Sequence, residues 1–213
     1  MKCHSANCVL GMAFILLFMA KQITPLNRLR AHYDYDRARS VAICAPLKPE
    51  DYVVQPHPDV SPPKWHLGHV SWFFENFILA EYLEHYELFD QRLNWFFNSY
   101  YESQGPRIVR SSRGNMTRPE LSVVLAYRTH VDEGIQALLL SKHPELEKIS
   151  TLVELGLHHE QQHQELLVTD IKYILGTNPF YPAYADQYPG KPGPVSDPPP
   201  QSAYIKVSGG LQP

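Results

Sequence analysis

Residues 144–175 read PELEKISTLVELGLHHEQQHQELLVTDIKYIL, a run that contains no proline after its first residue and that predicts one long helix. Gly176 and Pro179 follow and end the helical pattern. His159 and His163 lie four positions apart in this run, so they share one helix face, with Cβ atoms roughly 6 Å apart. Two neutral imidazoles at this spacing can bind one cation. The stretch therefore predicts a helix that carries half of a metal site.

Three further helical segments precede this one. Thr24 and Pro25 have the pattern of a helix cap and a first-turn proline, and the helix that they begin extends to Cys44. A second run begins at residues 61–63 and ends near Leu88, and a third covers residues 117–141, beginning with the spacing of a capping box. Four long helices without a convincing strand hairpin predict an all-α fold, a helix bundle.

The connection between the second and third helices, residues 89–116, is long for a bundle. It holds a cluster of aromatic residues, and several arginines follow that cluster. Aromatic side chains disfavour disorder, and long connections in compact domains are often functional. We expect this connection to be ordered over one end of the bundle. The residues concerned are Trp95, Phe96, Phe97, Tyr100, Tyr101, Arg107, Arg110, Arg113 and Arg118.

Composition limits the class of protein. The chain has 213 residues, 44% of them hydrophobic, and a formal charge of −3, which is typical of a soluble globular protein without a bulk attraction to nucleic acid. Cys3, Cys8 and Cys44 form neither an even disulfide framework nor a Cys-x-x-Cys metal spacing. We therefore expect a reducing compartment, the cytoplasm.

The two ends of the chain differ from its middle. Residues 1–22 form an apolar N-terminal extension whose apolar stretch, 9–20, is too short to span a membrane. It is interpreted either as an upstream extension before a natural start at Met19 or as an export signal. We expect no membrane partner unless this apolar segment is a genuine part of the protein. Residues 23–178 form the predicted bundle. Residues 179–213 are a Pro-rich linker that ends in what resembles a first strand and turn.

The metal site needs a third ligand from a facing helix, and His69 is the best candidate. It shares an apolar helix face with Trp65 and Trp72, so the alternative is a core histidine with satisfied nitrogens. His66 and His158 lie near the candidate ligands, so each either contacts a ligand or is exposed, and we expect both to be exposed.

The pattern His-Glu-x-x-His at 159–163 is also that of zinc proteases, in which the glutamate is the general base. Those enzymes need a further ligand downstream, but no Glu or His follows Glu165. Asp170 lies two helical turns beyond His163, too far to bind the same metal. The protease interpretation is therefore disfavoured, and Glu160 is expected beside the ligands or at the surface.

Arg110 and Arg113 admit two interpretations. They either belong to a solvated basic loop or bind an anionic substrate, because guanidinium groups suit bidentate contacts with carboxylates.

Several segments together resemble the N-terminal DinB-like domain of the ergothioneine-biosynthesis sulfoxide synthases, also called hercynine oxygenases. The resemblance extends from about residue 25 to the end of the chain. The segments that carry it are 59–69 (DVSPPKWHLGH), 97–101 (FNSYY), 113–119 (RGNMTRP) and 158–166 (HHEQQHQEL).

This resemblance implies a DinB-like four-helix bundle with a non-haem Fe(II) bound by His69, His159 and His163. It also implies that Gln162 lies near the hercynine substrate, and that Arg110 and Arg113 face carboxylates of the thiol substrate. The implied reaction uses O₂ to join the sulfur of cysteine or γ-glutamylcysteine to the imidazole ring of hercynine. The ligands alone permit Zn or Ni as well as iron.

The family continues into a second domain that resembles formylglycine-generating enzymes, and this chain stops where that domain would begin. We therefore expect a truncated or split synthase, with a separately encoded second domain as a partner, and its catalysis is left open. Two alternatives remain: a DinB-type metal-dependent thiol transferase and a non-catalytic metal-binding module.

Overall fold

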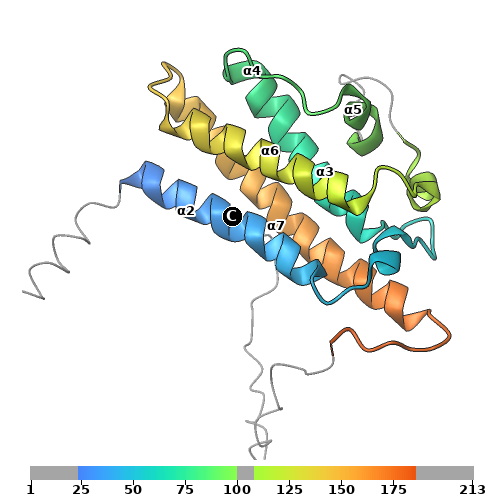
Figure 1. Ribbon diagram of the computed structural model, residues 1–213. Helices are drawn as coiled ribbons and strands as arrows, with labels where there is room; N and C mark the ends of the chain where they lie inside the picture. The colour runs from blue at the N-terminus through green and yellow to red at the C-terminus, as the bar shows by residue number, and fades with distance from the viewer. Residues whose placement is uncertain (1–23, 100–107, 186–213) are drawn as a thin grey trace, which may run out of the picture.

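The computed structural model describes residues 24–99 and 108–185, and it contains no strand in these ranges. Four long helices lie alongside one another as a bundle (Figure 1): α2 (Pro25–Cys44), α3 (Pro63–Phe74), α6 (Leu121–Leu140) and α7 (Leu146–Gly176). Helix α3 packs against both α6 and α7, and α2 packs against α7. The predicted all-α bundle is confirmed.

The first and last helices begin and end close to the predicted residues. Thr24 caps α2 because its Oγ1 accepts a hydrogen bond from the backbone N–H of Asn27, at 3.1 Å. Helix α7 continues through both histidines to Gly176. The start of α2 depends on a capping residue followed by a proline, and the end of α7 depends on a glycine followed by a proline. Both signals are local, so the sequence was sufficient to place these two ends.

The second helix ends earlier than predicted. It passes into a π-helical segment, η2 (Glu75–Leu79), and ends after the short helix α4 (Ala80–Tyr82) rather than near Leu88. The Glu75 carboxylate is fully buried and accepts hydrogen bonds from the hydroxyls of Tyr86 and Tyr127 and from the Phe89 backbone. These contacts fold residues 83–89 back against the helix.

The predicted capping box of the third helix does not form. Glu120 is the N-cap residue of α6 and makes no side-chain capping bond, while Thr117 lies outside the helix. The Lys64 ammonium instead donates to the carbonyls of Met116, Thr117 and Pro119. A contact from α3 thus positions the start of α6, which sequence spacing alone does not reveal.

The described parts of the long connection are ordered, as expected. They contain helix α5 (Gln91–Phe97), which packs against α3, and the 3-10 helix η4 (Arg110–Asn115). A further 3-10 helix, η1 (Pro49–Val53), follows α2. Tyr100, Tyr101 and Arg107 lie outside the described residues.

The predicted N-terminal extension, 1–22, and most of the predicted linker, from residue 186 onward, also lie outside the described residues. Among the helices that the structure describes, none combines the length and apolar character needed to cross a membrane.

Candidate metal centre

The contact between α3 and α7 brings three histidines together. His69 lies on α3, and His159 and His163 lie one turn apart on α7. One nitrogen of each ring lies within 4.8 Å of one nitrogen of the other two. The sequence placed two of these residues by helical spacing and the third by its position on the apolar face of a facing helix. The structure gathers all three at one point.

The free nitrogens of these rings suit a metal ion. His69 Nδ1 donates to the carbonyl of Phe97 at 2.7 Å, which leaves Nε2 as an unprotonated lone pair. His159 Nδ1 is buried and has no hydrogen-bond partner among the described residues. A buried polar atom without a partner is costly in a folded protein, and a bound metal would remove that cost if this nitrogen ligates it. The residues present therefore fit a divalent transition metal.

The electrostatic environment keeps the three imidazoles neutral, which is the form that binds metals. Burial lowers the pKa of His159 to about 4. Burial and the neighbouring histidines lower the pKa of His69 and of His163 well below the ordinary value. Proton competition for these ligands is therefore weak at neutral pH.

The histidines form one wall of a cavity of about 400 Å³. All three residues predicted to bind substrate line the same cavity: Arg110, Arg113 and Gln162. The cavity also contains Trp65, whose ring stacks on His69 with 4.5 Å between the ring centroids.

The two arginines are held differently. Arg113 is buried, with its guanidinium 3.3 Å from the centroid of the Trp65 ring, and it donates to the hydroxyls of Ser61 and Ser99. Arg110 is exposed and donates to the Asp59 carbonyl. Arg113 is therefore a fixed positive charge in the wall, whereas Arg110 lies at the solvent side. Gln162 is also exposed.

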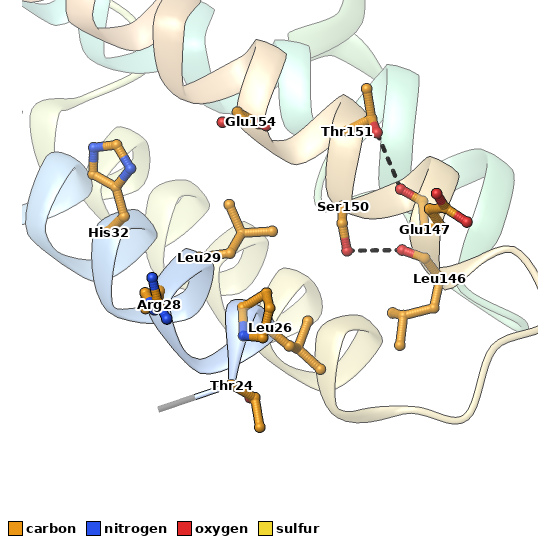
Figure 2. Close-up of a pocket in the computed structure, with 11 residues that line it drawn as sticks. Thr24, Leu26, Arg28, Leu29, His32, Leu146, Glu147, Ser150, Thr151 and Glu154 are labelled. Carbon is orange, nitrogen blue, oxygen red and sulfur yellow. Dashed lines mark hydrogen bonds between the residues drawn. The ribbon is translucent and has the colours of Figure 1, made fainter. Parts of the chain in front are cut away.

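A larger cavity, of about 680 Å³, lies between the first turns of α2 and α7 (Figure 2). Its lining includes Leu26, Leu29 and Leu146. The hydroxyls of Ser150 and Thr151 bond to carbonyls of their own helix, as the dashed lines in Figure 2 show. Among the described residues, the group of side chains that could hold a metal ion lies at the smaller cavity, beside His69, His159 and His163, so that cavity is the better candidate site.

The expectation that His66 is exposed was wrong. The residue is 3% exposed, its Nε2 contacts Asp170 at 2.9 Å, and its Nδ1 contacts Nδ1 of His163 at 2.9 Å. Asp170 is not one of the candidate metal ligands, but it contacts His66, which in turn contacts the candidate ligand His163. The missed signal was the helix face, since His66 lies one turn before His69. The expected exposure of His158 is confirmed.

Glu160 is fully buried and does not face the cavity. It is bound by Arg37, Arg128 and Ser40 on the other side of α7. Of the two expectations for this residue, surface exposure was wrong.

The profile of the DinB superfamily matches residues 32–167, a range that contains His69, His159 and His163. A search of curated proteins found no match.

Proposed function

The chain belongs to the DinB superfamily, and we propose that its bundle binds one divalent transition-metal ion through His69, His159 and His163. The observation that carries the proposal is the convergence of three neutral imidazoles at the α3–α7 contact, one of them with a buried nitrogen that has no hydrogen-bond partner in the described part of the chain. Three neutral ligands leave coordination positions open for substrates.

The reaction that we propose is the iron-dependent sulfoxide synthesis implied by the sequence resemblance. A thiol RSH and hercynine, written ArH, react with one O₂ to give the sulfoxide RS(O)Ar and one water, so no external reductant is needed. Bound Fe(II) supplies the O₂-dependent oxidation. The fixed charge of Arg113 would bind a substrate carboxylate, Arg110 would close over it from the solvent side, and Gln162 would orient the hercynine ring.

A second candidate is a metal-dependent thiol transferase, because the same three imidazoles suit Zn²⁺ or Ni²⁺ and either ion lowers the pKa of a bound thiol. The cavity wall would serve this reaction in the same way, with Arg113 fixing the carboxylate of a small thiol.

Metal binding is tested first. The purified chain is incubated anaerobically with Fe(II), and the bound metal is measured after gel filtration. We expect about one ion per chain, and loss of binding in His159→Ala and His163→Ala. His158→Ala is the matched control because His158 is exposed on the same helix. Unchanged metal content in the two ligand variants would overturn the site.

Activity separates the two reactions. The Fe(II)-loaded chain is mixed with hercynine and either cysteine or γ-glutamylcysteine in air, and O₂ consumption and sulfoxide are measured. Sulfoxide formation supports the synthase. Alkylation of the thiol by an added alkyl halide, with release of halide, by the Zn²⁺-loaded chain and without O₂ consumption supports the transferase and contradicts the synthase.

A further inference from the structure

A buried chain of hydrogen bonds leads from α7 through α3 and back to a candidate ligand. Asp170 Oδ2 accepts the backbone N–H of Ser61 at 2.9 Å and contacts His66 Nε2 at 2.9 Å. The other nitrogen of His66, Nδ1, lies 2.9 Å from Nδ1 of His163. The connection therefore runs from Asp170 to His66 and then to His163.

The Asp170 carboxylate, which can only accept, determines which nitrogen carries the proton at each step of this hydrogen-bonded series. Asp170 Oδ2 already accepts from Ser61, and as a carboxylate oxygen it also accepts from His66, so His66 carries its proton on Nε2. His66 Nδ1 then presents a lone pair, and His163 Nδ1 must donate to it. The remaining nitrogen of His163, Nε2, is left unprotonated and available to a metal.

We infer that His66 and Asp170 are positioning residues that fix the tautomer and ring orientation of His163 so that Nε2 binds the metal. This inference rests on the proposed metal centre. His69 has the same arrangement by a simpler route, since its Nδ1 donates to the Phe97 carbonyl. Two of the three ligands thus have an anchored Nδ1–H and a free Nε2, as expected of metal-binding histidines.

The intermediate histidine is needed for geometric reasons. Asp170 lies seven residues after His163 on α7, about two turns away, so its carboxylate does not contact the His163 ring directly. His66 bridges this gap from α3 and is itself 3% exposed. The bridge also links the helix of His69 to the helix of His159 and His163.

The test compares His66→Leu with His66→Asn in the full chain. Asparagine places a carbonyl oxygen near the position of Nδ1 and still accepts from His163, whereas leucine fills the space without an acceptor. Binding of Co²⁺ alone is titrated through its visible absorption, which reports both affinity and ligand geometry. We expect His66→Leu to weaken Co²⁺ binding about 10–100-fold and to change the spectrum. His66→Asn should restore most of the affinity and the wild-type spectrum.

Asp170→Ala should weaken Co²⁺ binding less than His66→Leu, because His66 remains but loses its orientation. His158→Leu and His158→Asn are matched controls and should leave binding unchanged. Circular dichroism at the same temperature verifies that each variant is folded. Equal Co²⁺ binding in wild type and His66→Leu, or equal loss in His66→Leu and His66→Asn, would overturn the inference while leaving the metal centre intact. If the wild-type chain binds no Co²⁺, the metal centre and this inference both fail.

A second measurement reads the tautomer directly. Long-range ¹H–¹⁵N spectra of the Zn²⁺-loaded chain should show His163 protonated on Nδ1 and bound through Nε2. Binding through Nδ1 would contradict the inference whatever the affinities of the variants.

Discussion

At the scale of single residues, Glu160 shows how a motif position acquires a role that the motif does not predict. Its carboxylate is 0% exposed, accepts from Arg37 and Arg128 at 3.0 and 2.9 Å, and accepts from Ser40 at 2.6 Å. Burial alone would raise the pKa of this carboxyl, but the two guanidinium groups lower it below its ordinary value. Glu160 is therefore a charged structural residue, which excludes the general-base role of the zinc-protease pattern.

We predict that Glu160→Gln destabilises the protein by about 3–5 kcal/mol, because it leaves two buried guanidinium groups without their shared carboxylate. Asp132 still contacts Arg37 at 2.6 Å, so part of the charge remains compensated. The free energy of unfolding is measured in urea. Glu154→Gln, at an exposed position of the same helix, is the control and should change it by less than about 0.5 kcal/mol. Equal stability of the two variants would contradict this account of Glu160.

At the scale of the elements, local signals were sufficient for some boundaries and insufficient for others. The start of α2 and the end of α7 followed from caps and breakers next to them in sequence. The early end of the second helix depends on Glu75, whose partner Tyr127 lies 52 residues along the chain and whose other partner, Tyr86, lies beyond the end of the helix. Helical periodicity does not encode such contacts, so it extended this helix too far.

Contacts between helices also explain which residues of the candidate site could be predicted from the sequence and which could not. His159 and His163 were predictable because one helix holds both, and His69 because its face is apolar. The pairing of His66 with Asp170 requires the register between α3 and α7, which no spacing within either helix gives.

The packing of α5 on α3 depends on a close approach between Gly68 and Phe97. A Cβ added at Gly68 would lie 2.2 Å from ring atoms of Phe97, whose carbonyl anchors His69. We predict that Gly68→Ala destabilises the protein by about 1–3 kcal/mol through overpacking, which exceeds the gain of up to about 1 kcal/mol in helix propensity. It should also weaken Co²⁺ binding, because Phe97 must move.

Gly176→Ala is the matched control for Gly68→Ala. It lies at the last residue of α7, and an added Cβ would meet nothing within 4 Å among the described residues. Urea unfolding and Co²⁺ titration are measured on both variants. A Gly68→Ala variant as stable as wild type, with unchanged Co²⁺ affinity, would show that α5 does not hold His69 in place.

At the scale of the whole molecule, the bundle buries the imidazoles of His66 and His69 and half-buries those of His159 and His163 at one helix contact. Burial is the main cause that lowers the pKa of His66, His69, His159 and His163. In the unfolded chain these groups take up protons near pH 6.5, whereas in the folded chain they remain neutral to lower pH. The unfolded state therefore binds more protons below pH 6.5, and the stability of the metal-free protein must fall as the pH falls.

Metal binding should stabilise the folded protein by the same amount across this pH range. Thermal unfolding is followed from pH 7 to 5.5, with and without Zn²⁺ at about 100 times its dissociation constant. Without metal, stability should fall by up to about 1.4 kcal/mol per pH unit for each proton taken up by the unfolded chain. Zn²⁺ should add about 2.7 kcal/mol at every pH in this range, because the folded ligands are already neutral and protons compete weakly.

The two unfolding curves should therefore run parallel as the pH falls. An exposed histidine site behaves differently, since its ligands protonate near pH 6.5 and the gain from Zn²⁺ disappears below that value. A gain that vanishes with a midpoint near pH 6.5 would place the metal on surface histidines rather than between α3 and α7. His163→Ala is the control: it should lose the gain from Zn²⁺ and also flatten the pH dependence of the metal-free protein, because one buried imidazole is gone.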